Sequence, residues 1–387
     1  MRLAALTATL VLSMAQAATI RIASVSPLSG SLAPIGSEVK RGAELAVQQQ
    51  QRAFRALGYD LELVALDDQA TASNAAPLAK RMMDDPSLLG VVGALNSSVT
   101  NVLGGALAPS SLALISPAST NTGLSENGWN NFSRLVAPDS AQAVAAVKYM
   151  LEELKARKVF IVSDNTAYGN GLSKTVQVNL KKNNLTLSGY MGASNAQQVS
   201  SAVKAIKAAS PDVVYYGGTD DNGSQLVKAL RGAGVKAVFM GGDGLDSPSF
   251  VERAGSAAAG VVYSTGFGPI DPMTGRQYIR LYQAAYKEQA SGVSAYAYDS
   301  TVVLLEAIKT LLEQGKMPTR AQVSSAVRQV KLDGCRSDLP ICTTISGPVA
   351  FDDRGEHERS RVYIVTLNSK GVSEITTVKT VTAASLR

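Results

Sequence analysis

Residues 88–100 read LLGVVGALNSSVT, and this stretch indicates the fold class. Its first six residues are apolar or glycine, which is typical of a strand buried on both faces of a parallel sheet. The polar residues that follow lead into a helical stretch, so Ser97 and Ser98 stand where a helix would begin. A strand, a short polar loop and a helix in this order predict an α/β unit.

The same order recurs along the chain on both sides of that stretch. The expected strands span 20–25, 61–66, 88–93, 112–115, 158–163, 185–190, 213–217, 237–240 and 261–264, with helical patterns between them. This alternation predicts an α/β protein of two Rossmann-like lobes with parallel sheets. Beyond these strands we expect helices at 276–289, 298–314 and 319–330, and then strands at 349–351 and 361–367.

The composition removes most kinds of enzyme chemistry. The chain has 387 residues and is 45% hydrophobic, which suits two globular lobes. One histidine, His357, and two cysteines exclude paired-histidine and four-thiolate metal sites and do not support a Ser-His-Asp triad. No stretch matches a phosphate-binding loop or a nucleophile elbow, so we expect no catalytic residues, no metal and no cofactor. The net charge of +6 is spread over the whole length, which does not favour a nucleic-acid partner.

The first 17 residues have the pattern of a signal peptide. Arg2 precedes an apolar run over 3–14, and 15–17 has the small-x-small form of a cleavage site. The alternative is a cytosolic chain that begins with a buried helix. We expect export to the periplasm or another extracytoplasmic compartment, with no cysteine after the cleavage site to carry a lipid. Because such a compartment is oxidising, we expect Cys335 and Cys342 to form a disulfide that closes a small loop.

Polar loops follow the strands at the positions where α/β proteins bind ligands, the carboxyl ends of parallel strands. The loops at 94–100 and 116–122 carry hydroxyl side chains and backbone N–H groups, which favour an anion, although Ser97 could instead be an ordinary helix cap. In the second half, Asp243 stands between glycines, where it can project into a cleft or simply form a turn. A carboxylate opposite an anion site is complementary to a zwitterion.

An ordered set of short motifs covers nearly the whole chain after residue 17. The motifs lie at 22–30, 42–46, 67–68, 115–118, 168–171, 215–218 and 347–352. Together they resemble the periplasmic branched-chain amino acid (Leu/Ile/Val)-binding protein family of ABC transporters. The resemblance implies a type I periplasmic binding fold, whose two lobes close on a ligand and are joined by three crossovers, here near 137–138, 265–266 and Ser346. It implies an N-terminal lobe of 18–137 plus 266–345, a C-terminal lobe of 138–265 plus 346–370, and a C-terminal tail of 371–387.

The resemblance also implies a ligand site. The matching positions in this chain are Ser97, Ala118, Thr120, Tyr168, Thr219, Asp243 and Tyr296. In the family, the positions of Ser97, Ala118 and Thr120 hold the ligand carboxylate, and that of Asp243, usually Glu, holds the ammonium. Tyr168 matches a tyrosine that closes over the ligand, and Tyr296 matches an aromatic position of the lining. Ile35 and Thr219 stand where the family has aromatic residues, so branched-chain specificity does not carry over.

We therefore expect an extracytoplasmic solute-binding protein of an ABC importer. It would capture a small amino acid or amino acid-like ligand between its lobes and deliver it to the membrane permease. We expect the binding protein to be a monomer. One alternative is a ligand-sensing module of a signalling system with the same fold, which a fused membrane or output domain would mark. Another is a secreted α/β hydrolase, against which the missing nucleophile elbow counts.

Overall fold

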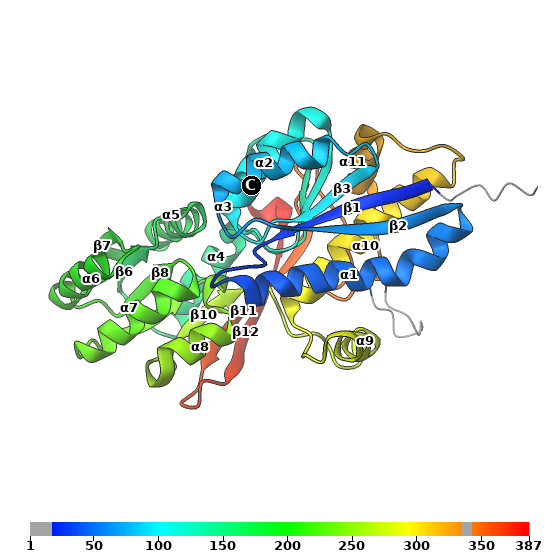
Figure 1. The fold of residues 1–387 in the computed structure, drawn as a ribbon. Coiled ribbons are helices and arrows are strands. Elements are labelled where there is room, and N and C mark those ends of the chain that lie inside the picture. Colours follow the sequence, from blue (N-terminus) through cyan, green and yellow to red (C-terminus); the bar gives the residue numbers. More distant parts are fainter. Residues whose placement is uncertain (1–17, 335–342, 387) are drawn as a thin grey trace, which may run out of the picture.

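The computed structural model describes residues 18–334 and 343–386, which form two α/β lobes side by side (Figure 1). The sheet of the first lobe is parallel throughout and has the strand order β2-β1-β3-β4-β5. Its strands are β1 (Ala18–Ser26), β2 (Tyr59–Asp67), β3 (Leu88–Gly93), β4 (Ala113–Ser116) and β5 (Phe132–Arg134). The helices of this lobe are α1 (Ala33–Ala56), α2 (Ala72–Met83), α3 (Ser97–Leu107), α9 (Arg276–Tyr286), α10 (Gly292–Leu312) and α11 (Arg320–Gln329).

The sheet of the second lobe has seven strands in the order β12-β11-β10-β9-β8-β6-β7. These are β6 (Lys158–Ser163), β7 (Thr186–Gly192), β8 (Val213–Gly217), β9 (Val238–Gly241), β10 (Val262–Thr265), β11 (Arg359–Leu367) and β12 (Ser373–Thr382). Strands β6 to β10 are parallel, whereas β11 and β12 are antiparallel to their neighbours. The helices are α4 (Asp139–Glu152), α5 (Ala167–Lys182), α6 (Ala196–Ala209), α7 (Asp220–Gly232) and α8 (Pro248–Ala254).

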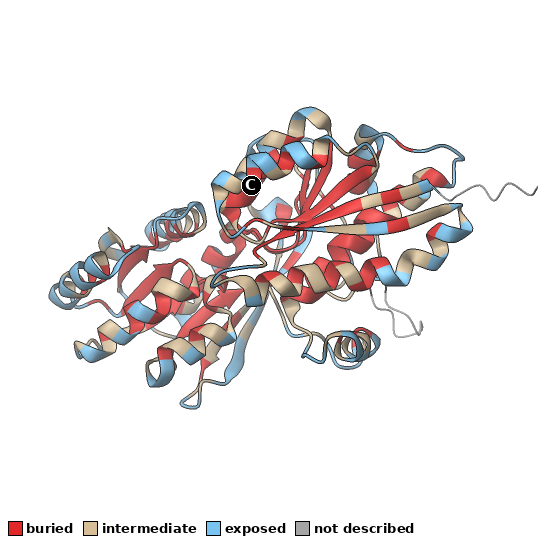
Figure 2. Cartoon of the chain, viewed as in Figure 1, coloured by how far each residue is buried: buried red, intermediate tan, exposed pale blue. Residues whose placement is uncertain are grey.

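Helices cover both faces of each sheet, so the central strands are buried on both sides (Figure 2). In β6, Val159 and Ile161 pack against α4 and α5, while Phe160 and Val162 pack toward α6, α7 and α8. Alternate residues of a strand point to opposite faces, so a strand covered on both sides needs apolar residues at successive positions. This is why the strands appear as continuous apolar runs. In the described part of the chain, no helix is both long and apolar enough to cross a bilayer.

The chain passes between the lobes three times. The first passage joins β5 to α4, and the second leaves β10 for α9. The third lies later than the expected position near Ser346, because Val349 and Phe351 still pack in the core of the first lobe and β11 begins only at Arg359. The apolar strand pattern that marks β11 does not reveal which lobe the preceding residues join.

The expected C-terminal tail at 371–387 is wrong for most of its length. Residues 373–382 form β12, which pairs antiparallel with β11 at the edge of the second sheet. Its side chains are mostly exposed, and Val381 packs against the core from the edge. An edge strand of this kind needs no continuous apolar run, so its Thr-rich sequence resembles that of a frayed end.

A buried ion pair ties the first and third passages together. Arg134, at the end of β5, is 0% exposed and donates through Nε to Oε2 of the buried Glu356 at 3.1 Å. Its Nη1 also donates to the carbonyl oxygens of Ser119 (3.1 Å) and Asn121 (2.7 Å). One guanidinium therefore holds a sheet edge, a loop after β4 and the segment that leads into β11.

Replacing Arg134 tests this anchor. We expect Arg134→Met to lower the free energy of unfolding by about 3–5 kcal/mol, because Glu356 would remain as a buried charge without its partner. Urea unfolding followed by circular dichroism measures the change. The matched control is Arg55→Met, which removes an ion pair to Asp60 on a side chain 68% exposed and should change the stability by no more than about 1 kcal/mol. Equal losses in the two variants would contradict the anchoring role.

Candidate ligand-binding site

A cavity of about 400 Å³ lies between the lobes, and we call it the inner chamber. Loops that follow β1, β3 and β4 form its first-lobe wall, and loops that follow β6, β8 and β9 form its second-lobe wall. All of these loops lie at the carboxyl ends of parallel strands. The residues that line it include Ser31, Leu32, Ile35, Leu95, Ser97, Ala118, Thr120, Tyr168, Thr219, Asp220, Asp221, Asp243, Asp246 and Phe267.

The first-lobe wall offers hydroxyl groups and the start of a helix. Ser97 is the first residue of α3, and its Oγ accepts a hydrogen bond from the backbone N–H of Asn121 at 3.2 Å. Ser97 does not cap the helix, because Asn96 occupies the cap position. The first N–H groups of a helix lack partners within it and carry partial positive charge. Ala118 and Thr120 follow β4 beside this helix start, so the wall suits a carboxylate.

The second-lobe wall presents a buried carboxylate. Asp243 follows β9 and is 7% exposed; its Oδ1 accepts a hydrogen bond from the hydroxyl of Tyr168 at 2.6 Å. The same hydroxyl accepts from the N–H of Gly244 at 2.9 Å, which holds the tyrosine ring beside the acid. Burial, with a smaller contribution from Asp246, raises the pKa of Asp243 to about 6, although the hydrogen bonds from Tyr168 and Gln142 oppose the shift. At neutral pH the ionised form of this group is therefore favoured, and no lysine or arginine among the described residues pairs with it.

A second carboxyl group lies close behind this wall. Asp139, the first residue of α4, is fully buried, and burial together with the nearby Asp243 raises its pKa well above the ordinary value. Its backbone N–H donates to the carbonyl oxygen of Thr120 at 2.7 Å. This shift favours the neutral form of Asp139 beside Asp243.

Two hydrogen bonds join the lobes directly across the cavity rim. The hydroxyl of Ser31 donates to Oδ2 of Asp221 at 2.6 Å, and the side-chain amide of Asn121 donates to the carbonyl oxygen of Ala167 at 2.5 Å. Each bond pairs a first-lobe loop with the start of a second-lobe helix. The structure thus has the lobes in contact around the inner chamber.

Six of the seven residues predicted for the ligand site line this chamber together. The exception is Tyr296, a residue of α10 that is 7% exposed and lies in the core of the first lobe. Its ring meets the ring of Phe267 edge-on, with centroids 5.7 Å apart, and Phe267 supplies the aromatic wall. Thr219 lines the chamber as the cap residue of α7, and its N–H donates to Asp164 at 3.1 Å.

Phe267 and Asp246 line the chamber, although neither was predicted for the ligand site. Phe267 stands directly after the predicted passage at 265–266, and a passage between two lobes borders their cleft, so its position was a usable signal. Asp246 lies three residues after Asp243, and its N–H donates to the carbonyl oxygen of Asp243 at 3.0 Å. This short turn, which brings a second acid to the same wall, has no distinctive sequence pattern.

Comparison with known proteins agrees with this architecture. The family profile described as "periplasmic binding protein" matches residues 19–372. The Leu/Ile/Val-binding protein of Escherichia coli (strain K12) is 29% identical over 344 residues, which cover 89% of this chain and 89% of the relative.

Two crystal structures share the fold at lower identity. A leucine-binding protein from Thermotoga maritima superposes with a TM-score of 0.81 at 22% identity, covering 93% of this chain and 98% of the other. A solute-binding protein from R. palustris in complex with benzoate superposes with a TM-score of 0.80 at 17% identity, covering 95% and 98%.

The raised pKa of Asp243 predicts how pH affects the stability of the ligand-free protein. Between the ordinary carboxyl pKa and about 6, the folded state binds this proton more tightly than the unfolded chain, so Asp243 stabilises the fold at low pH and this contribution falls as pH rises. Relative to Asp243→Asn, the wild-type protein should lose about 2 kcal/mol of unfolding free energy between pH 4 and pH 7. Urea unfolding at both pH values measures this, with the exposed Asp60→Asn as control. Parallel profiles for wild type and Asp243→Asn would contradict the prediction.

Proposed function

This chain belongs to the periplasmic binding protein family, and from that premise we propose that its inner chamber holds a small α-amino acid or a similar ligand for delivery to the membrane permease of an ABC importer. The family binds solutes and is not an enzyme family, and we assign no reaction to this chain. The E. coli relative carries the name Leu/Ile/Val-binding protein, which supports an amino acid as the ligand.

One observation carries the proposal: the two walls of the inner chamber have opposite preferences. Ser97 and the start of α3 favour an anion from the first lobe, while Asp243 favours a cation from the second. An α-amino acid carries both charges, on two groups bonded to the same carbon atom. Ser97, Ala118 and Thr120 would take its carboxylate, and Asp243, supported by Tyr168, would take its ammonium.

This division of contacts explains how binding would favour the closed arrangement. A ligand shifts a conformational equilibrium only by the difference between its contacts in the two states. A zwitterion held by Ser97 at one end and Asp243 at the other bridges the lobes, and it can make both contacts only when they are closed. The bonds Ser31–Asp221 and Asn121–Ala167 would then add direct contacts between the lobes.

The rest of the lining leaves space beyond the α-carbon. Leu32, Ile35, Leu95 and Phe267 provide apolar surface for a side chain. Thr219 and Ile35 are smaller than the aromatic residues expected at these positions from the resemblance, so the pocket is more open at these points. We therefore do not restrict the ligand to a branched-chain amino acid.

Several parts of the proposal concern the protein outside this site. We propose export through a signal peptide at 1–17 and a disulfide between Cys335 and Cys342, both of which lie outside the described residues. We further propose a monomer that acts in the periplasm, with no nucleic-acid partner. Intact mass of the secreted protein would report both the cleavage and the disulfide.

The role of Asp243 is tested by calorimetry. The amino acid that raises the melting temperature most in a panel of twenty serves as the probe. We expect Asp243→Asn to weaken its binding by about 2 kcal/mol or more, which is about thirty-fold, because the ligand ammonium would lose its charged partner. Asp60→Asn, which removes an exposed carboxylate far from the chamber, is the matched control and should bind as the wild-type protein does.

The ligand class is tested by native mass spectrometry of gently purified protein and by thermal shift. An amino acid carried through purification, or one that raises the melting temperature, is the expected result, because a ligand stabilises the state that binds it. Since one structural relative binds benzoate, aromatic carboxylates belong in the same panel. A response to benzoate with none to any amino acid would contradict the ammonium role of Asp243.

A further inference from the structure

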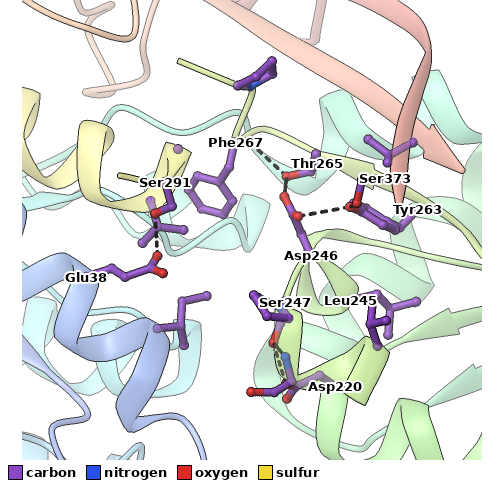
Figure 3. Close-up of a pocket in the computed structure, with 18 of the residues that line it drawn as sticks. Glu38, Asp220, Leu245, Asp246, Ser247, Tyr263, Thr265, Phe267, Ser291 and Ser373 are labelled. Carbon is purple, nitrogen blue, oxygen red and sulfur yellow. Dashed lines mark hydrogen bonds between the residues drawn. The ribbon is translucent and has the colours of Figure 1, made fainter. Parts of the chain in front are cut away.

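A second and larger cavity adjoins the inner chamber, and we call it the outer chamber (Figure 3). It has a volume of about 1040 Å³ and lies between α1 and the loop before α10 on one side and α8, β10, β11 and β12 on the other. The two chambers share lining residues, so they adjoin each other. The shared residues are Ser31, Leu32, Ile35, Asp220, Asp246, Ser247 and Phe267.

The lining of the outer chamber is apolar with negative charge and no positive charge. Its carboxylates are Glu38, Asp220, Asp246 and Glu252, and none of the described residues that line it is Lys or Arg. Apolar side chains fill the surface between them. A cavity of this kind is complementary to a ligand group that combines an aliphatic chain with a cation.

Two of these carboxylates extend from opposite lobes toward the same space (Figure 3). Glu38, on α1, accepts a hydrogen bond from the hydroxyl of Ser291 at 2.5 Å. Asp246 accepts from the hydroxyls of Tyr263 at 3.1 Å and Thr265 at 2.8 Å. Burial raises the pKa of Glu38 to about 7, with Asp246 adding to the shift, and burial raises that of Asp246 to about 6. In the described part of the chain, neither forms an ion pair.

Two arginines near the chamber already form ion pairs with other carboxylates. Arg253 pairs with Asp220 and Asp221, and its side chain is not part of the chamber lining. Arg41, one turn along α1 from Glu38, pairs with Glu288 and lies over the ring of Tyr286.

One buried acceptor at the junction of the chambers remains unused. Asp220 is 3% exposed, and its Oδ2 accepts from the hydroxyl of Ser247 at 2.9 Å and from Arg253 at 3.2 Å. Its Oδ1 has no hydrogen-bond partner among the described residues, although Asp220 lines both chambers. A buried polar atom without a partner is costly, so this oxygen indicates a donor that comes from outside the chain.

We propose that the outer chamber receives the cationic end of the ligand, so that the ligand is an α-amino acid whose aliphatic side chain ends in an ammonium or guanidinium group. The inference rests on the proposed function, which places the α-carbon of the ligand in the inner chamber. From there, Leu32, Ile35 and Phe267, which line both chambers, would cover the methylene groups. The terminal cation would then lie between Glu38 and Asp246.

Pairs of ligands that differ in the terminal charge test this proposal. Refolded, ligand-free protein is titrated calorimetrically with arginine and its neutral analogue citrulline, and with lysine and its neutral analogue norleucine. We expect the cationic member of each pair to bind about ten-fold or more tightly, because only it compensates the two carboxylates. Glu38→Gln and Asp246→Asn should each reduce that preference by about ten-fold, while Glu62→Gln, on the outer surface, should leave it unchanged.

Three outcomes would overturn the inference in whole or in part, and they differ in what they say of the proposed function. Neutral analogues that bind as tightly as the cationic amino acids would refute a cation in the outer chamber and leave the amino acid function intact. No binding of any amino acid, or of agmatine, which is arginine without its carboxylate, would refute both. Agmatine binding that is lost in Glu38→Gln, without any amino acid binding, would keep the cation site and refute the amino acid function.

Discussion

The parallel direction of the central strands is the constraint on which the rest of the structure depends. Because β1, β3 and β4 run the same way, their carboxyl ends share one edge of the first sheet, and β6, β8 and β9 do the same in the second. The three passages of the chain set these two edges opposite each other. Ser97 after β3 and Asp243 after β9 face one space for this reason. A wall that favours an anion and a wall with a carboxylate therefore meet where the strand ends of the two α/β lobes face each other.

The buried guanidinium of Arg134 connects this site to the passages between the lobes. It bonds to Glu356, on the segment that leads into β11, and to the backbone on either side of Thr120. Buried charges attract each other strongly but only in a good geometry, so such a pair specifies one arrangement more than it adds stability. The loop that would hold a ligand carboxylate and the segments about which the lobes would move are thus parts of one connected structure.

Among the described residues that line the cleft, carboxyl groups are present and lysine and arginine are not. Burial raises the pKa values of Asp243, Asp246 and Glu38, which means that ionising each of them costs free energy in this environment. A cation that enters the cleft would offset this cost. In a binding protein such an imbalance is useful, since it makes the stability of the closed arrangement depend on the ligand rather than on the lobes alone.

The sequence by itself determined the elements and the loops that matter. The apolar runs that became β1 to β4 and β6 to β10 are local patterns, because a strand covered on both faces needs apolar residues wherever it lies. The three-residue strand β5 (Phe132–Arg134) has no such run and was not predicted. The loops containing Ser97 and Asp243 could be identified for the same reason, as polar segments at strand ends. The helix expected at 298–314 already begins at Gly292, because Ser291 and Ser294 cap each other there, a signal that is local but short.

Only the tertiary structure decided the contacts between distant segments. It placed Phe267 rather than Tyr296 in the wall of the inner chamber, kept Phe351 with the first lobe and joined 373–382 to the second sheet as β12. It also brought Glu38 and Asp246 to one cavity from opposite lobes. The spacing of apolar residues in a segment indicates which of its faces are buried. It does not indicate which other segment packs against them, because the two segments can be hundreds of residues apart in the sequence.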